Sequence, residues 1–186
     1  QNPNKFTLER VLFKTMPTVT TGTATVVTRN GIKQLKLVSA ATAGHIIAYW
    51  DFDASLFTRE FAGSLIIEDA DAGSNGYVGI QQISSTGTIL ATSYAQTFLA
   101  DAIAKKVFRM TSTGVVSGAV KIRLIAFLQT TTTRQMYVHS PFIADGTNTD
   151  FIAPMEDLNP IKDKVIQLGN AFDVVSGKNM FNPALS

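Results

Sequence analysis

The stretch AVKIRLIAFL, residues 119–128, indicates the fold class, because its apolar residues alternate with the period of a β-strand. Successive side chains of a strand point to opposite faces of a sheet. One face of this strand is apolar throughout and consists of Val120, Ile122, Leu124, Ala126 and Leu128. The opposite face carries Lys121 and Arg123 beside Ile125 and Phe127. We therefore expect a strand with one face in a core and the other at a surface.

The next apolar segment along the chain, residues 135–140, alternates in the same way. Its methionine and valine share one face, and Tyr137 and His139 share the other. A short threonine-rich loop joins this segment to residues 119–128, which predicts that the two strands are partners in one sheet. If their apolar faces align, Arg123, Tyr137 and His139 lie on one outer surface.

A third alternating segment, HIIAYWDF at residues 45–52, contains the only tryptophan of the chain. Its inward face is predicted to consist of Ile46, Ala48, Trp50 and Phe52. His45, Tyr49 and Asp51 then point outward. We expect Trp50 to belong to the core, since large aromatic side chains are mostly buried.

The remaining β-rich segments are separated by turn formers at intervals of roughly 10 residues, as in a sandwich or barrel. We expect a hairpin of residues 18–28 and 32–39 around Arg29-Asn30-Gly31, and single strands at residues 64–68, 77–83, 88–92 and 107–113. Residues 95–106 are rich in alanine and predict a weak helix, with a loop across the sandwich as the alternative. The fold class predicted is all-β, an antiparallel β-sandwich of the jelly-roll type with a short C-terminal helix.

The C-terminal part changes character. Five apolar residues spaced 3, 4, 3 and 4 apart form one helical stripe: Leu158, Ile161, Val165, Leu168 and Phe172. A helix of this length is marginal in water, so the stripe needs a partner, either the sandwich or the same helix of other chains. We predict an oligomer seam, with a homotrimer as the assembly. The predicted organisation is a lead-in segment (1–17), the sandwich (18–153), a helical stalk (154–175) and the start of a further segment (176–186).

Composition excludes several classes of function. The formal net charge is only +2 and lysine and arginine form no run, which argues against a nucleic-acid partner. The chain has no cysteine, and no apolar run reaches the roughly 18 residues of a membrane span. It contains two histidines and none of the G-x-S-x-G, H-E-x-x-H or Walker patterns, so we expect neither an enzyme nor a cofactor or metal site.

One acidic turn offers oxygen ligands, since Glu68, Asp69 and Asp71 lie close together in the sequence. Such carboxylates could hold a calcium ion, but their spacing departs from that of an EF-hand loop. We expect a solvated turn instead.

Three stretches carry a resemblance to a known family: HIIAYWDF (45–52), AVKIRLIAF (119–127) followed by RQMYVHSPFIADG (134–146), and GKNMFNP (177–183). With them the chain resembles the carbohydrate-binding-module-like jelly rolls of bacteriophage tail fibre and baseplate proteins and of secreted glycan-degrading enzymes. The last strand of that family usually has an acidic pair where this chain has His139-Ser140, so the family's calcium site is not carried over.

The resemblance implies a non-catalytic structural and receptor-binding module of a phage tail fibre, located in the virion, that binds host surface polysaccharide. The alternative is a carbohydrate-binding module of a secreted bacterial enzyme. Sugar binding suits the outward residues, because aromatic rings cover the apolar face of a pyranose while polar tips bond its hydroxyls. The candidate ligand-binding residues are Tyr49, Asp51, Arg123, Tyr137 and His139. An ordinary solvated sheet face or a subunit contact is the competing interpretation.

Overall fold

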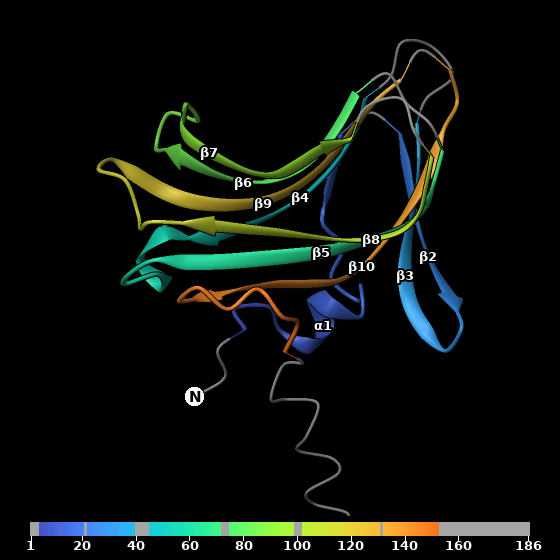
Figure 1. The fold of residues 1–186 in the computed structure, drawn as a ribbon. Coiled ribbons are helices and arrows are strands. Elements are labelled where there is room, and N and C mark those ends of the chain that lie inside the picture. The colour runs from blue at the N-terminus through green and yellow to red at the C-terminus, as the bar shows by residue number, and fades with distance from the viewer. Residues whose placement is uncertain are drawn as a thin grey trace, which may run out of the picture.

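The fold is known from a computed structural model that describes residues 4–20, 22–39, 45–71, 75–98, 102–130 and 132–152. In this part of the chain, strands form two five-stranded sheets in which every pairing is antiparallel. The two sheets stack face to face (Figure 1), so the predicted β-sandwich is confirmed. The strands are β1 (Thr18–Thr20), β2 (Thr23–Arg29), β3 (Ile32–Val38), β4 (His45–Asp53), β5 (Phe61–Ala70), β6 (Asn75–Ser84), β7 (Ile89–Phe98), β8 (Ile103–Ser112), β9 (Ala119–Gln129) and β10 (Gln135–Asp145).

The strand order is β1-β4-β9-β6-β7 in one sheet, called sheet A here, and β2-β3-β10-β5-β8 in the other, called sheet B. The inward faces meet in the core that the alternation predicts. Trp50, Leu124 and Ile67 are all at most 1% exposed. Val120 is an exception, because it lies at the start of β9 and is 42% exposed.

The predicted hairpin of β2 and β3 is confirmed, with Arg29 opposite Ile32 and a tight turn at Asn30 and Gly31. The stretch before it, however, divides between the sheets. β1 pairs with β4 in sheet A, whereas β2 pairs with β3 in sheet B. Gly22 lies at the change of sheet with a φ of 123°, a conformation that only glycine adopts readily.

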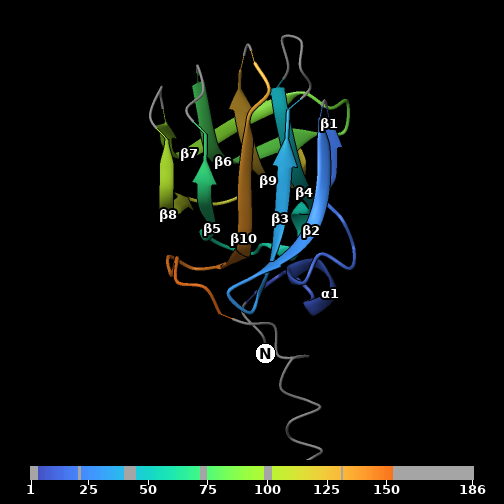
Figure 2. The same cartoon turned by 90° about the vertical axis from the view of Figure 1, so that its right-hand side faces the viewer.

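Two predictions about neighbouring segments are wrong. Residues 95–98 and 103–106 are the end of β7 and the start of β8, not a helix, because pairing with β6 and β5 outweighs the local preference of alanine. The strands β9 and β10 are not partners either. Figure 2 shows β10 between β3 and β5 in one layer and β9 in the layer behind. The loop between β9 and β10 therefore crosses from one sheet to the other.

The N-terminal segment, predicted as a lead-in, contributes to the core. Phe6 is 2% exposed and packs edge to face against Trp50 and Phe52, at centroid distances of 5.7 and 4.9 Å. The short helix α1 (Leu8–Val11) follows, with the Thr7 side chain accepting a hydrogen bond from the backbone N–H of Arg10. The one 3-10 turn among the described residues, η1 (Ala54–Leu56), follows β4.

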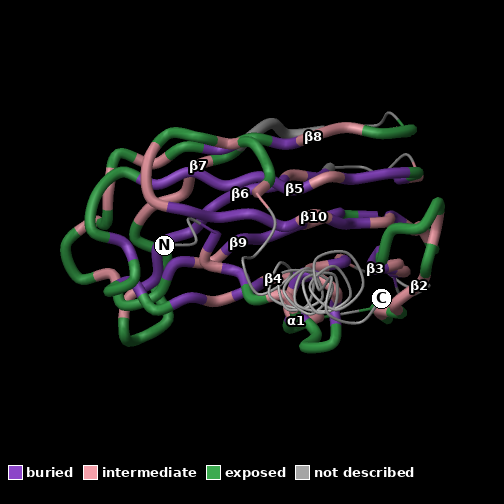
Figure 3. Tube along the Cα trace, turned by 90° about the horizontal axis from the view of Figure 1, so that it is seen from below, coloured by how far each residue is buried: buried purple, intermediate pink, exposed green. Residues whose placement is uncertain are grey.

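Burial is concentrated in the strands, while the connections at their ends are mostly exposed (Figure 3). The predicted stalk and its seam lie outside the described residues, namely Leu158, Ile161, Val165, Leu168 and Phe172. Among the described residues, no helix has the length and apolar character needed to cross a bilayer.

Candidate functional site

Sheet A is curved, and its concave side faces away from sheet B (Figure 1). The outward-pointing side chains of β4 and β9 lie on this side, because strand parity sends their alternate residues into the core. Asp51 is in register with Arg123, and Tyr49 with Ile125. The structure thus brings together three of the predicted ligand-binding residues, Tyr49, Asp51 and Arg123. We call the surface made by these residues and their outward-pointing neighbours on sheet A the concave face.

At the centre of the concave face, Arg123 and Asp51 form a two-pronged ion pair. Arg123 Nε donates to Asp51 Oδ1 at 2.7 Å and Nη2 donates to Oδ2 at 3.0 Å. The guanidinium carbon lies 3.6 Å from the centroid of the Tyr49 ring. The hydrogen bonds to Asp51 raise the pKa of Arg123. The guanidinium is therefore fixed in position and charged before any ligand arrives.

An aromatic group continues the concave face toward β6 and β7. Tyr77 stacks on Phe127 at 4.9 Å and meets Tyr94 edge to face at 4.8 Å. Gly79 leaves room for this contact, because a Cβ there would lie 3.3 Å from Tyr94 Cδ1. Tyr94 is 54% exposed, so its ring is open to solvent. Gln81, in register with Arg123, completes the row.

Sequence reasoning missed Tyr77, Tyr94 and Gln81. The parity of residues 77–83 was sufficient to place Tyr77 and Gln81 on the outer face. Tyr94 was missed because it lies between the predicted strand at residues 88–92 and the predicted helix at residues 95–106, so no face was assigned to it. A register shift between Val78 and Gly79 also breaks the simple alternation there.

The side chains of the concave face are suited to contacting a ligand, but both carboxylates that β4 places on this face already have partners. The Asp51 carboxylate is engaged by Arg123, and the Asp53 carboxylate accepts a hydrogen bond from the Ser55 backbone N–H at 2.8 Å. That hydrogen bond lowers the pKa of Asp53. Glycoside hydrolysis usually needs one protonated and one ionised carboxyl group across the substrate. The two outward carboxylates of β4 do not provide that pair.

The prediction that Tyr137 and His139 share a surface with Arg123 is wrong, because β10 belongs to sheet B. Tyr137 lies on the outer side of sheet B, with the Arg29 guanidinium carbon 4.2 Å from its ring centroid. His139 points to the same side but is only 1% exposed. The alternation of the strand correctly places His139 on the outer side of the sheet, but the side chain is not exposed, because neighbouring polar side chains cover the imidazole.

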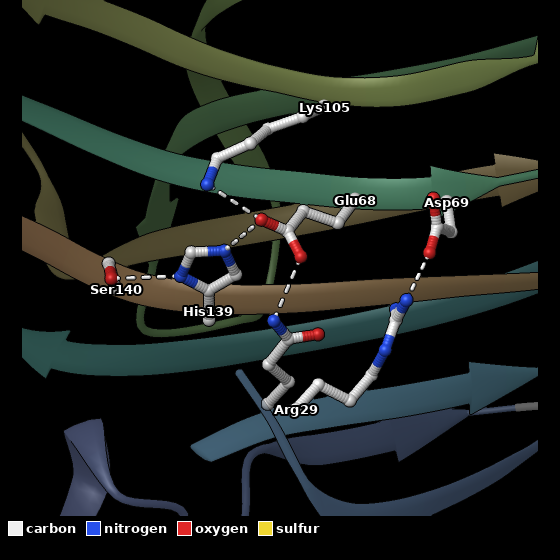
Figure 4. Close-up of polar contacts among 7 residues, drawn as sticks. Arg29, Glu68, Asp69, Lys105, His139 and Ser140 are labelled. Carbon is white, nitrogen blue, oxygen red and sulfur yellow. Dashed lines mark hydrogen bonds and ion pairs between the residues drawn. The ribbon is translucent and has the colours of Figure 1, made fainter. Parts of the chain in front are cut away.

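These neighbours form a buried polar network around Glu68 (Figure 4). Lys105 Nζ lies 2.8 Å from Glu68 Oε1, and Gln34 Nε2 donates to Oε2 at 2.9 Å. His139 Nε2 lies 3.3 Å from Glu68 Oε1, and His139 Nδ1 lies 3.0 Å from the Ser140 hydroxyl. The bond from Lys105 is the main reason why the pKa of Glu68 falls to about 2. Burial lowers the pKa of His139, so its ring is neutral at pH 7.

The acidic turn is therefore not simply solvated. Glu68 belongs to the network, Asp69 pairs with Arg29, and Asp71 accepts a hydrogen bond from the Gln135 backbone N–H at 2.9 Å. Each of the three carboxylates has a different partner, so they do not converge on a common oxygen cage. Within the described ranges, no group of three or more acidic, histidine or cysteine side chains is arranged to hold a metal.

No family model matches the chain, and no curated protein matches its sequence. Solved structures match its fold. The enzymatically active domain of tailspike protein 4 from bacteriophage CBA120 aligns with 76% of this chain at a TM-score of 0.58 and 13% identity. The chain covers only 21% of that structure.

Carbohydrate-binding modules match as well. A module from a study of promiscuous specificity in the β-sandwich superfamily aligns with 76% of this chain and 62% of its own length, with a TM-score of 0.53 and 14% identity. The family 11 module of the Clostridium thermocellum cellulase Lic26A-Cel5E aligns with 78% of this chain and 94% of its own length, with a TM-score of 0.51 and 12% identity. The chain thus shares the β-sandwich fold of carbohydrate-binding modules.

Proposed function

We propose that this domain is a glycan-binding module and that the concave face of sheet A is its binding surface. The observation that carries the proposal is the Arg123–Asp51 ion pair stacked on Tyr49, next to the aromatic group of Tyr77 and Tyr94. Rings of this kind cover the apolar face of a sugar, and the guanidinium and carboxylate edges can bond its hydroxyls. The module binds at this face without chemistry, because the outward carboxylates of β4 are already engaged.

Two physical arguments support a sugar over other ligands. The opposite charges of Arg123 and Asp51 cancel, so the centre of the face is suited to an uncharged ligand. The ion pair also holds both side chains in place, so binding costs less side-chain entropy than it would with free side chains.

The setting proposed is a phage tail fibre, in which the domain is a structural and receptor-facing part of the virion and meets polysaccharide of the host surface. The fold likeness to a bacteriophage tailspike domain supports this setting, as does the resemblance of GKNMFNP to phage tail sequences. A carbohydrate-binding module of a secreted glycan-degrading enzyme is the second candidate, supported by the fold likeness to such modules.

The assembly distinguishes the two candidates. In the fibre, the stripe from Leu158 to Phe172 would be the seam of a homotrimer. We expect trimeric mass by light scattering for the full chain, and monomeric mass after Ile161→Asp and Val165→Asp. A monomeric full chain would favour the secreted module.

Glycan-array binding tests the surface itself. Tyr49→Ala and Arg123→Met should each weaken the best array signal at least tenfold, which corresponds to about 1.4 kcal/mol of binding free energy. Tyr137→Ala is the matched control, because it removes a tyrosine from the outer side of sheet B. Unchanged affinity of the first two variants would remove the proposal, and loss of binding in the third alone would move the site to sheet B.

A further inference from the structure

Ser140 has a strained backbone at a point where β10 is irregular. Its φ is 50°, although it is not a glycine, and the register of β10 with β5 shifts between His139 and Phe142. In a regular strand, consecutive side chains point to opposite faces and do not meet. The bulge instead brings the Ser140 hydroxyl to 3.0 Å from His139 Nδ1. Backbone strain of this kind persists only where the surroundings enforce it, and it is frequent at functional sites.

The orientation of the imidazole makes this contact chemically useful. A neutral imidazole has one N–H donor and one acceptor nitrogen. His139 Nε2 lies 3.3 Å from Glu68 Oε1, a close electrostatic contact without hydrogen-bond geometry. The ionised carboxylate favours the tautomer whose proton is on Nε2, because that proton then faces the negative charge. The Nδ1 atom is then the acceptor and receives the hydrogen bond of the Ser140 hydroxyl (Figure 4). The charged groups around the ring are Glu68 and Lys105, and Gln34 holds the second oxygen of Glu68.

Ser140 also lines a pocket of about 350 Å³. The walls are mainly apolar and come from α1, the start of β3 and the segment after β10: Val11, Leu12, Ile32 and Phe151, with Lys33 as the one charged member. This volume lies at the lower end of the range of about 300–1,000 Å³ that is typical of small-molecule sites. A small, mostly apolar group fits such a space.

We propose that Ser140 is a nucleophile, with His139 as its base and Glu68 as a positioning residue, and that the pocket accepts the short acyl group of a carboxylic ester. The Ser140 oxygen forms a bond to the carbonyl carbon while its proton passes to His139 Nδ1. The ester C–O bond then breaks, and the alcohol leaves with that proton. A water molecule gives a proton to the same nitrogen, attacks the acyl-serine and releases the carboxylic acid, which restores the serine and the neutral imidazole. This arrangement has the logic of a serine–histidine–acid triad, which is recognised by geometry and not by sequence order.

This site lies away from the concave face and is independent of glycan binding, because it is built on sheet B. The absence of G-x-S-x-G in the sequence does not argue against it, since folding brings residues 68, 139 and 140 together from two strands.

A fluorophosphonate probe tests the nucleophile directly, because it forms a covalent bond with activated serines. We expect one adduct, mapped to Ser140 by peptide mass spectrometry, and slow hydrolysis of p-nitrophenyl acetate and butyrate. Ser140→Gly removes the hydroxyl and suits a positive φ, so this variant should fold. It should lose the adduct and lower the hydrolysis rate about 100-fold or more. Ser117→Ala, an exposed serine in the loop before β9, is the matched control and should keep both.

Two further variants separate positioning from simple folding. Glu68→Gln should lower kcat with little change in KM, because it disturbs the base and not the pocket. Lys105→Met removes a cation beside the imidazole, so the pH at which hydrolysis reaches half its maximum should rise. Absence of an adduct at Ser140, or equal hydrolysis by Ser140→Gly, would show that the serine–histidine contact is only structural and would overturn the proposal.

Discussion

Glu68 is only 9% exposed yet keeps its negative charge, because Lys105, Gln34 and His139 all reach its carboxylate. A buried charge is costly unless it is paired and hydrogen-bonded. The network therefore joins four strands of sheet B, because the Glu68 side chain of β5 contacts residues of β3, β8 and β10. Replacing the carboxylate by an amide should leave one of the two donors, the Lys105 ammonium or the Gln34 amide, facing an NH2 group instead of an acceptor oxygen.

We expect Glu68→Gln to lower the free energy of unfolding by about 1–3 kcal/mol at pH 7. The folded-state pKa of Glu68 is about 2, below its ordinary value of 4.5, so the folded protein binds this proton more weakly than the unfolded chain. The stabilisation by Glu68 is complete above pH 4.5 and is lost as the pH falls toward 2. The difference in free energy of unfolding between the wild-type protein and Glu68→Gln should therefore become smaller over that range. Urea unfolding at several pH values measures this difference. Glu60→Gln, at an exposed position, is the control and should change the free energy of unfolding by less than about 1 kcal/mol at pH 7.

His139 adds a second pH effect in the same direction. Burial lowers its folded-state pKa below the ordinary 6.5, so its contribution to stability is present above pH 6.5 and declines below it. The wild-type protein should therefore lose stability in two stages on acidification.

Single side chains also show how far the candidate site could be predicted. Parity alone placed Tyr49, Asp51 and Arg123 on an outer face, because both strands are regular there. It could not foresee that His139 is buried, since burial depends on Glu68 and Gln34, which are distant in the sequence.

At the scale of elements, the change of sheet at Gly22 is a point of close backbone approach. A Cβ at Gly22 would lie 2.5 Å from the Val38 carbonyl oxygen, and the φ of 123° is unfavourable for any other residue. Gly31 also has a positive φ, 76°, but nothing lies within 4 Å of a Cβ there. Both glycines have a positive φ, but only Gly22 has backbone atoms close to the position of a Cβ. Comparing their alanine variants therefore separates the cost of the steric clash from the cost of the backbone conformation.

Gly22→Ala should cost about 3 kcal/mol or more, because backbone strain and a clash with backbone combine. Gly31→Ala should cost about 1–2 kcal/mol, since only the left-handed conformation is penalised. Thermal unfolding of both variants measures the difference. If both variants lost the same free energy of unfolding, the backbone between β1 and β2 would be able to move away from Val38 without destabilising the protein.

Element by element, strands were easier to predict than their neighbours. Alternation located β4, β9 and the first half of β10, because apolar side chains recur at every second position there. It could not decide which strands pair, since a loop that crosses between sheets resembles a hairpin loop in sequence. Residues 95–106 failed for a related reason, because their strand structure depends on pairing with β6 and β5 and not on local propensity.

For the molecule as a whole, the N-terminal segment closes the core between the sheets. The Lys5 backbone N–H donates to the carbonyl of Ile143 in β10 at 2.8 Å, while Phe6 packs on Trp50 and Phe52 of β4. The same few residues thus contact both sheets. The domain is expected to depend on a segment that its sequence marks as polar.

Phe6→Ala should therefore lower the free energy of unfolding by about 3–5 kcal/mol, because it leaves a cavity beside the only tryptophan of the chain. Leu56→Ala is the control, since Leu56 is 47% exposed and its truncation should cost less than about 1 kcal/mol. Urea unfolding followed by tryptophan fluorescence reports on the site itself, because Trp50 contacts the Phe6 ring. If Phe6→Ala lowered the free energy of unfolding no more than Leu56→Ala does, the core of the sandwich would be closed without the N-terminal segment. The predicted boundary at residue 18 would then stand as the start of the folding unit.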